Sequence, residues 1–390
     1  MKALVIEKKN LLNIKKKWSP KETLSLRDNI ILPEIAENEA LVKIKSAGLN
    51  FNTVWSSIAY PVDPFALLNG HVRRNPNDKK HLRDYFIPGS DGSGEIVKIK
   101  KNKNFKEGDE VVIHCAVIAD KDLKMKDPML SKTQSVWGYE TNFGSFAEYS
   151  IVKISQLIPK PKNLPWNISG SYMLTLGTAY RMLASVNGLD LKRNDTCFIW
   201  GASGGLGIFA IQICNYLGVK PICFVSNNDK KEFCKKFGAK YIISLSEMEN
   251  KKFFLKNGEF NTKFWSEIST SIYSLIGTNK VDAVFEHPGA DTLALSIFLL
   301  RRGGKVVTCA ATSGYKAKID LRYLWMELKQ IIGSHFCNST EANIASDLVA
   351  KGHVKHTPSK IIELEDIPEN LNNIFQRKTF GKIAVDLNKN

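Results

Sequence analysis

Hydrophobic and polar residues alternate in two different ways along this 390-residue chain, and the change comes near residue 160. Before that point, short segments with a period of two are cut by Gly, Pro and Asp, as in residues 40–48, 94–100 and 108–115. This pattern is typical of strands and turns. After it, helix-length segments alternate with short apolar runs. The runs that predict buried strands are residues 195–200, 220–226, 240–244, 281–286 and 304–310.

Strands and helices in alternation predict a doubly wound parallel sheet, with the β-rich region forming a further domain. A chain of this length with 43% hydrophobic residues can bury two separate cores. We therefore expect an α/β protein of two domains.

The net charge is +16, which raises the question of an anionic partner. The basic residues are spread over the whole length, in short clusters such as residues 15–17 and 99–104. They are not interleaved with aromatic residues as in a groove that binds single strands. We expect no nucleic-acid partner, whereas a nucleotide or a coenzyme A ester would profit from the same positive field.

The chain contains no run of eighteen apolar residues, and residues 1–10 do not resemble a cleavable leader. We therefore expect a cytoplasmic protein without a membrane partner. Seven cysteines are scattered without CxxC pairs, which is unlike a structural zinc site. They are expected to be reduced and mostly buried.

The first predicted strand of the second half runs into a glycine turn, 200-WGASGGLG-207, and then into an amphipathic helix. Such a turn lets the backbone approach a pyrophosphate, which rests on the helix N-terminus. The surrounding strands make this a dinucleotide site. Its expected cofactor-binding residues are Gly201, Ser203, Gly204, Gly205, Leu206 and Gly207.

The end of the next strand favours NADPH over NADH. An NAD site usually offers an acidic residue there to the ribose 2′-hydroxyl, but this chain has Ser226 and Asn227, followed by Lys230 and Lys231. A 2′-phosphate would meet donors and positive charge, and we assign Ser226 and Lys230 to it. The alternative is that the lysines only solvate the next helix, and Asp229 in the same loop speaks against a phosphate.

A β-rich region followed by a dinucleotide-binding domain resembles the medium-chain dehydrogenase/reductase superfamily. Zinc-dependent members carry a His-Glu pair where this chain has Ser90 and Asp91, in 87-IPGSDGSGEIV-97, so no catalytic metal is expected. Without a Lewis acid, hydride is more readily delivered to a double bond conjugated with a carbonyl. Enoyl or quinone reduction is the expected chemistry.

Further segments closely resemble crotonyl-CoA carboxylase/reductase from about residue 30 to the end. They are 45-KSAGLNFNTVWSSIAYPVDPF-65, 137-WGYETNFGSFAEY-149, 178-TAYRML-183, 285-FEHPG-289, 312-TSGY-315, 322-RYLWM-326 and 333-GSHF-336. The resemblance implies an NADPH-dependent homotetramer that couples reduction of an enoyl-CoA to capture of CO2. It also implies a GroES-like catalytic domain of residues 1–160 and 336–390 around a Rossmann domain of residues 161–335.

The resemblance further implies a CO2 pocket formed by Asn52, Tyr139, Glu140 and His335. Asn52 is preferred to Asn50, although a slip by one residue would turn a strand side chain to the opposite face. In the family's chemistry, hydride addition at the β-carbon leaves an enolate that must meet CO2 before a proton. His287 is expected to bind the cofactor and Arg322 the coenzyme A ester.

Two other functions stay open at this point. One is a non-carboxylating enoyl-CoA or quinone reductase, and the other is a non-enzymatic NADPH-binding protein with an RNA or regulatory role. Bicarbonate dependence separates the first from a carboxylase, and a turnover assay separates the second.

Overall fold

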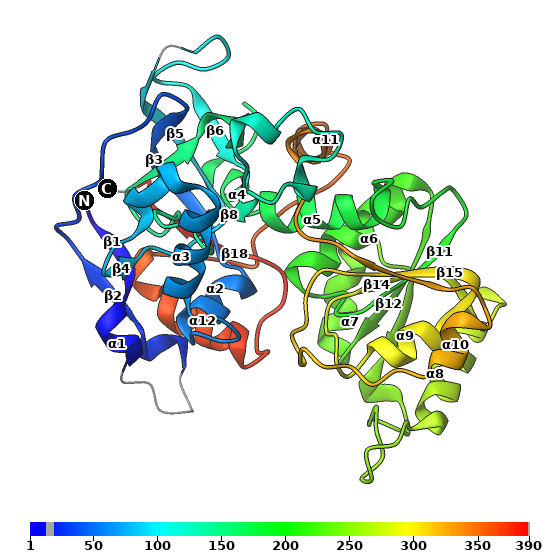
Figure 1. The fold of residues 1–390 in the computed structure, drawn as a ribbon. Coiled ribbons are helices and arrows are strands. Elements are labelled where there is room, and N and C mark those ends of the chain that lie inside the picture. Colours follow the sequence, from blue (N-terminus) through cyan, green and yellow to red (C-terminus); the bar gives the residue numbers. More distant parts are fainter. Residues whose placement is uncertain (13–18, 101, 389–390) are drawn as a thin grey trace. The chain divides into compact units, whose positions relative to one another are not determined.

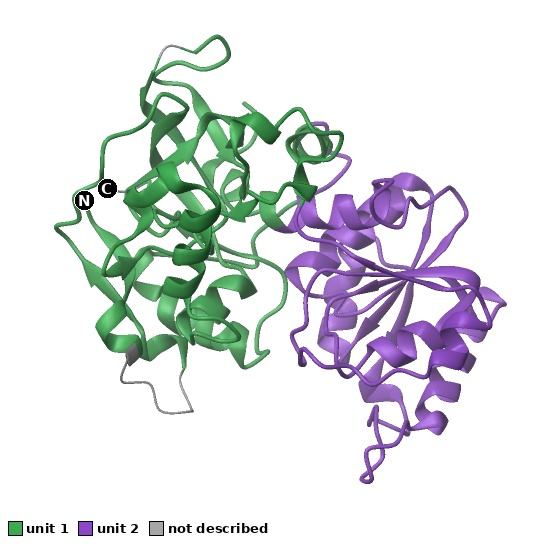
Figure 2. Ribbon diagram, viewed as in Figure 1, with its two compact units in different colours: residues 1–174, 337–350, 356–390 green, residues 175–336, 351–355 purple. Residues whose placement is uncertain are grey.

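The computed structural model describes residues 1–12, 19–100 and 102–388, which form two compact units (Figure 1, Figure 2). Unit 1 comprises Met1–Leu174, Cys337–Ala350 and His356–Asn390, and unit 2 comprises Thr175–Phe336 and Lys351–Lys355. The lysine cluster at 15–17 lies outside the described residues.

Unit 1 is built on a seven-stranded sheet with the order β10-β6-β5-β3-β18-β17, in which β9 also pairs with β3. The C-terminal strand β18 pairs antiparallel with β3, with Ala384 opposite Gly48. The end of the chain therefore completes a sheet that residues before 160 begin. The strands are β3 (Glu39–Gly48), β5 (Gly92–Ile99), β6 (Glu110–Ile113), β9 (Tyr149–Lys153), β10 (Leu157–Pro159), β17 (Lys360–Ile362) and β18 (Ile383–Asp386).

Two small sheets and several helices complete unit 1. The small sheets are formed by β1 (Ala3–Glu7), β2 (Leu24–Arg27) and β4 (Tyr85–Phe86), and by β7 (Ala116–Val117) and β8 (Ser135–Val136). The helices are α1 (Lys8–Leu12), α2 (Phe51–Ser57), α3 (Pro64–Arg74), α4 (Trp166–Ser169), α11 (Ser339–Ala350) and α12 (Ile367–Phe375), and α5 (Met173–Ala184) begins at the end of the first segment.

Helix α3 carries residues that matter below. It begins at Pro64, whose fixed φ suits a first helical position, and the Asp63 side chain caps it by accepting from the Phe65 N–H at 2.8 Å. Phe65, Leu68 and His71 form its buried face. The helix ends at Arg74 because Pro76 disfavours a helical conformation at the residue before it.

Unit 2 contains a six-stranded parallel sheet with the order β13-β12-β11-β14-β15-β16, so the predicted doubly wound sheet is confirmed (Figure 1). All five expected strands are present. The sixth, β16, is an edge strand with the sequence QIIG, and its exposed residues do not form the buried apolar run by which the other strands were recognised. The strands are β11 (Thr196–Ile199), β12 (Lys220–Val225), β13 (Tyr241–Ser244), β14 (Val281–Glu286), β15 (Leu300–Thr308) and β16 (Gln330–Gly333).

Most helices of unit 2 pack against this sheet, and the inner strands are nearly continuous apolar runs because both faces are covered. The helices are α6 (Gly205–Leu217), α7 (Asn228–Lys235), α8 (Thr262–Ile276), α9 (Leu293–Leu299) and α10 (Leu321–Trp325). The seven cysteines are free and all but Cys309 are buried, as expected. Within the described part of the chain, no helix combines the length and hydropathy that crossing a membrane requires.

Candidate functional site

The glycine turn lies between β11 and α6, as predicted. Gly201 has φ +56°, and a Cβ atom there would lie 2.5 Å from His287 Nε2, so a side chain at this position is excluded by both conformation and space. Ser203 is buried, and Gly204 occupies the N-cap position of α6 without a capping side chain. The first N–H groups of Gly205, Leu206 and Gly207 thus stay available for an anion at the helix N-terminus.

The loop after β14 is fastened to this turn. His287 Nε2 lies 3.1 Å from the Trp200 carbonyl oxygen, and the Trp200 indole N–H donates to Ser296 Oγ at 2.8 Å. Ser296 in turn donates to the fully buried carboxylate of Glu286 at 2.6 Å. The neighbouring strand ends of β11 and β14 are therefore joined through one buried acid.

Glu286 was not recognised from the sequence, although an acid at the end of a buried strand is the signal that could have found it. Thr292 Oγ1 and the Gly289 N–H also donate to its carboxylate, at 2.8 and 3.0 Å. Burial raises the pKa of Glu286 to about 7, and these hydrogen bonds oppose the rise only in part.

Ser226 and Lys230 come together at the end of β12. Lys230 Nζ donates to Ser226 Oγ at 3.1 Å, and the Asn227 side chain accepts from the Lys230 N–H and so caps α7. Lys231 instead pairs with Glu247. Because β11, β12 and β14 are parallel neighbours, the glycine turn, this pair and His287 all lie at the carboxyl edge of one sheet, where dinucleotides bind.

Two further predicted residues of unit 2 lie at its surface. The Arg322 side chain is 78% exposed and pairs with Asp320 at 2.7 Å. His335 follows β16, is exposed, and has its ring 4.3 Å from that of Phe336, a non-glycine residue with φ +51°. Desolvation of the ring by the surrounding protein atoms lowers the pKa of His335 to about 4, and the Arg181 charge acts in the same direction. The imidazole is therefore neutral at pH 7.

In unit 1, residues 50–52 begin a helix, and the strand assumed for them is wrong. Asn50 is the N-cap residue of α2, and Asn52 lies in its first turn. Helix geometry separates the two amides: Asn50 donates to Asp91 Oδ2 at 3.1 Å and accepts from Lys382 Nζ at 2.6 Å. Asn52 is 8% exposed, with Nδ2 2.8 Å from Ser90 Oγ, and Oδ1 has no hydrogen-bond partner among the described residues.

Asp91, the residue after Ser90, is held in a buried ion pair. Its Oδ2 lies 3.0 Å from Lys382 Nζ, and its Oδ1 accepts from the Leu174 N–H at 2.8 Å. Burial lowers the pKa of Lys382, and the Asp91 charge opposes this. The carboxylate thus ties β5, β18 and the start of α5 together.

Tyr139 and Glu140 lie in a tight loop after β8. The N–H groups of residues 139, 140 and 141 all point to the Val136 carbonyl oxygen, at 3.2, 2.7 and 3.0 Å. Gly138 has φ +64°, and a Cβ there would lie 2.0 Å from the Gly89 carbonyl oxygen. The loop therefore packs directly on the segment whose Ser90 contacts Asn52.

Tyr139 and Glu140 are both half-buried. Burial raises the pKa of Glu140, and the nearby Arg74 opposes the rise. Arg74 Nη2 lies 3.3 Å from Glu140 Oε1. Sequence reasoning missed this arginine, which is 66 residues away in the chain.

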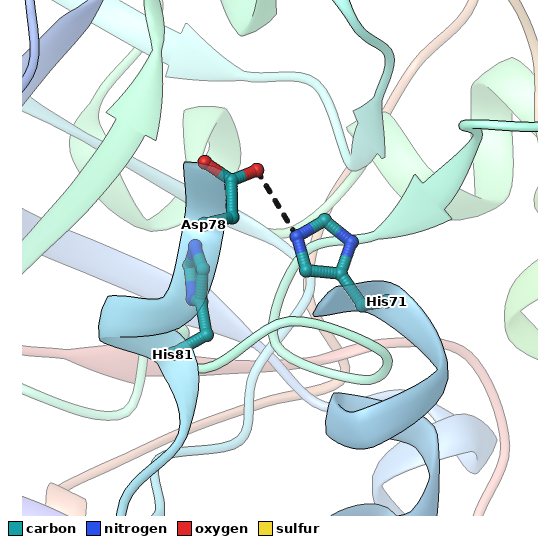
Figure 3. A group of neighbouring side chains, drawn as sticks. All are labelled: His71, Asp78 and His81. Atoms are coloured by element: carbon teal, nitrogen blue, oxygen red, sulfur yellow. Dashed lines mark hydrogen bonds and ion pairs between the residues drawn. The ribbon is translucent and has the colours of Figure 1, made fainter. Parts of the chain in front are cut away.

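Unit 1 also contains a buried group formed by His71, Asp78 and His81 (Figure 3). Each of the three side chains offers one potential metal-ligand atom, and these atoms lie within 4.8 Å of one another. Asp78 and His81 belong to the 3₁₀ helix η2 (Pro76–His81). His71 Nε2 lies 3.1 Å from Asp78 Oδ2, and Lys153 Nζ donates to Asp78 Oδ1 at 3.1 Å. A metal ion here would have to displace an ammonium group and break the His71–Asp78 bond.

The pKa values in this group agree with a hydrogen-bonded network. Burial raises the pKa of Asp78, but the His71 hydrogen bond and the Lys153 charge outweigh it and hold the pKa well below its usual range. Burial lowers the pKa of His81 to about 3, and His81 Nδ1 accepts from the Asn142 N–H at 3.2 Å.

The predicted residues are thus gathered at two places. Asn52 and the loop with Tyr139 and Glu140 meet in unit 1. One sheet edge in unit 2 carries the glycine turn, the pair of Ser226 and Lys230, and His287. Arg322 and His335 are exposed residues elsewhere in unit 2.

Comparisons with known proteins agree with both units. Residues 36–162 match the alcohol dehydrogenase GroES-like domain, and residues 205–351 match the family described as zinc-binding dehydrogenase. The chain is 42% identical to crotonyl-CoA reductase of Streptomyces collinus, over 94% of this chain and 82% of that protein. It is 38% identical to crotonyl-CoA carboxylase/reductase of Cereibacter sphaeroides, over 86% and 77% of the two chains.

Solved structures give the same result. A 2-octenoyl-CoA carboxylase/reductase in complex with NADP and 2-octenoyl-CoA has a TM-score of 0.94 at 34% identity, covering 99% of this chain and 87% of that one. With this degree of similarity in sequence and fold, the chain belongs to the crotonyl-CoA carboxylase/reductase family of oxidoreductases within the medium-chain dehydrogenase/reductase superfamily.

Proposed function

We propose that the protein catalyses NADPH-dependent reductive carboxylation of an enoyl-CoA. With crotonyl-CoA, the reaction is crotonyl-CoA + CO2 + NADPH giving ethylmalonyl-CoA + NADP⁺. The relatives with these activities and the geometry of the two units support the proposal. The observation that carries it furthest is the buried Asn52 amide, which keeps one polar atom without a partner.

The residues of unit 2 are proposed to bind and orient NADPH, which supplies the hydride for the β-carbon of the enoyl thioester. The glycine turn would hold the pyrophosphate on the N-terminus of α6. Ser226 and Lys230, 3.1 Å apart, would donate to the 2′-phosphate. Arg322 is proposed to contact a coenzyme A phosphate, for which its pairing with Asp320 must open.

Asn52 is proposed to bind CO2 next to the enolate that hydride addition leaves. Its amide can turn so that the Ser90 hydroxyl donates to Oδ1, and both N–H bonds of Nδ2 are then directed away from Ser90. In either orientation one buried polar group lacks a partner, which costs about 1–3 kcal/mol. An oxygen atom of CO2 accepting from Nδ2 would remove that cost, so the amide is poised for a ligand that accepts.

Tyr139, Glu140 and His335 are proposed to complete the pocket. The Tyr139 ring would exclude the water that protonates the enolate, and the Glu140 carboxylate would orient the donor. His335 is included on the family resemblance, and its neutral imidazole offers both a donor and an acceptor. A homotetramer is proposed on the same resemblance and is tested by light scattering of the purified protein.

The test is mass analysis of the product from crotonyl-CoA, NADPH and ¹³C-labelled bicarbonate with carbonic anhydrase. Labelled ethylmalonyl-CoA, with one NADPH oxidised for each label incorporated, is the expected result. Butyryl-CoA alone would instead make the protein a non-carboxylating reductase. A protein that binds NADPH without turnover would have the regulatory role.

A further inference from the structure

We infer that Arg74 is a positioning residue for Glu140, held in place by a buried chain of Ser135, His71 and Asp78. The inference rests on the proposed carboxylation and assigns a task to residues outside the predicted pocket. It gives a role to these three buried polar side chains, which connect through Arg74 to the loop that carries Glu140.

The contact between Arg74 and the loop is made by one nitrogen. Nη2 lies 3.3 Å from Glu140 Oε1 and 3.0 Å from Ser135 Oγ, so its two N–H bonds serve two acceptors. Ser135 begins β8, and the next residue supplies the carbonyl oxygen that receives the Glu140 N–H. Strand β8 therefore fixes the backbone of Glu140 and, through Arg74, its carboxylate.

The hydrogen bonds from Arg74 through Ser135 and His71 to Asp78 can all run in one direction, with each group donating to the next. Because Ser135 Oγ accepts from Arg74, its own hydrogen can go to His71 Nδ1, 2.9 Å away. His71 then carries its proton on Nε2 and donates to Asp78 Oδ2 at 3.1 Å. Lys153 donates to the other oxygen of Asp78. His71 is fully buried and Asp78 is 7% exposed, so these bonds are sheltered from competing water.

The chemistry of the proposed pocket explains why the Glu140 carboxylate needs the support of these hydrogen bonds. A protonated carboxyl group beside an enolate is an acid, and proton transfer to the α-carbon would form the reduced acyl-CoA in place of the carboxylated one. The burial of Glu140 favours that protonated form, and the Arg74 guanidinium opposes it. Arg74 thus counteracts protonation of the carboxyl group and, through the 3.3 Å contact between Nη2 and Oε1, also fixes which way it faces.

The experiment compares Arg74→Ala with Arg73→Ala, an exposed arginine one residue earlier on the same helix. For each protein, NADPH oxidation and the ratio of carboxylated to reduced product are measured at saturating bicarbonate, together with the KM for bicarbonate. We expect the product ratio of Arg74→Ala to fall roughly tenfold, as for loss of a hydrogen bond to a charged group, while NADPH oxidation falls much less. Arg73→Ala should behave as wild type.

Rescue separates positioning from damage to the helix. Arg74 lines a pocket of about 560 Å³, so guanidinium ion at a non-denaturing concentration can reach the vacated position. Added guanidinium should restore part of the product ratio in Arg74→Ala, and Arg74→Lys should retain part of it. Ser135→Ala, which removes the support but leaves the guanidinium, should fall between wild type and Arg74→Ala.

Several outcomes would overturn the inference. An unchanged product ratio in Arg74→Ala, with a wild type that carboxylates, removes the inference alone. A shift that neither guanidinium nor lysine reverses assigns Arg74 a merely structural role. Stoichiometric zinc bound by His71, Asp78 and His81 in the purified protein would replace the hydrogen-bonded chain with a metal site. A wild type that forms only reduced product removes the proposed function and this inference together.

Discussion

The Ser90 hydroxyl oxygen lies 2.8 Å from Nδ2 of Asn52, in the first turn of α2. Both side chains are buried. Ser90 thus orients the amide that is proposed to bind CO2.

Replacing Asn52 with Leu removes the amide and keeps much of its volume. Because the proposed CO2 donor is lost, the ratio of ethylmalonyl-CoA to butyryl-CoA should fall at least tenfold at saturating bicarbonate. Ser90→Ala, which leaves the amide without its buried partner, should give a smaller fall. Chromatography of the acyl-CoA products measures both, and equal ratios in all three proteins would exclude Asn52 from the CO2 site.

Glu140→Ala should shift the same ratio while hydride transfer largely continues, since the cofactor contacts proposed in unit 2 do not include this carboxylate. A water molecule can occupy the vacated space and protonate the enolate. Glu140→Gln is the matched variant, because it preserves an acceptor for Arg74 and removes the charge. Loss of NADPH oxidation in parallel with carboxylation would show a role in reduction instead.

The adjacent Ser226 and Lys230 predict a preference for NADPH over NADH of roughly ten- to a hundredfold in kcat/KM, as expected for one or two charge-assisted bonds to a phosphate. Lys230→Met should reduce this preference about tenfold by raising the KM for NADPH alone. Lys231→Met is the control, since Lys231 pairs with Glu247. Steady-state kinetics with both cofactors decide, and comparable values for wild type would contradict the assignment.

Glu286 should make stability fall as the pH rises. Its pKa is about 7 in the folded protein and about 4.5 unfolded, so between these values the folded state binds the extra proton. The stabilisation is complete below pH 4.5 and lost as the pH passes 7, by roughly 3 kcal/mol from this group. Urea unfolding of wild type and Glu286→Gln across this range measures the difference, which should shrink to nothing if Glu286 titrates normally.

Arg322 and the positive net charge predict that the KM for the acyl-CoA rises with ionic strength, because salt screens attraction between a cationic surface and coenzyme A phosphates. Arg322→Met should raise that KM at low salt and flatten its salt dependence. Lys316→Met removes an equal charge from an exposed position nearby and serves as the comparison. If the wild-type KM for the acyl-CoA does not change with ionic strength, the positive charge does not serve to attract coenzyme A.

The parallel sheet and the glycine turn could be predicted because their signals are local. Buried strands of parallel sheets are uniformly apolar, and the turn follows directly from one of them. Helix α2 could not, because its 7 residues are too few to show a helical period, and Asn50 and Asn52 look alike in sequence. Only the folded chain shows that Asn50 contacts Lys382 while Asn52 contacts Ser90.

The support of Glu140 could not be predicted for another reason. Arg74, Ser135 and Lys153 lie on separate elements, and a sequence pattern does not show which elements meet. The resemblance to a family identified the acid but carried no information on the arginine. Polar residues that act through partners distant in the chain thus appear only in the structure.

The position of β18 between β3 and β17 has a consequence for how the protein is made. During synthesis, the residues of unit 2 up to 336 leave the ribosome before residues 383–386, which fill a place inside the sheet of unit 1. Until then β3 lacks its neighbour on that side, and Asp91 lacks the Lys382 ammonium. Unit 2 can therefore fold first, and the unit with Asn52 and Glu140 is completed last. Until residues 383–386 have been made, the nascent chain exposes an unpaired strand edge, which is a place where other chains can pair.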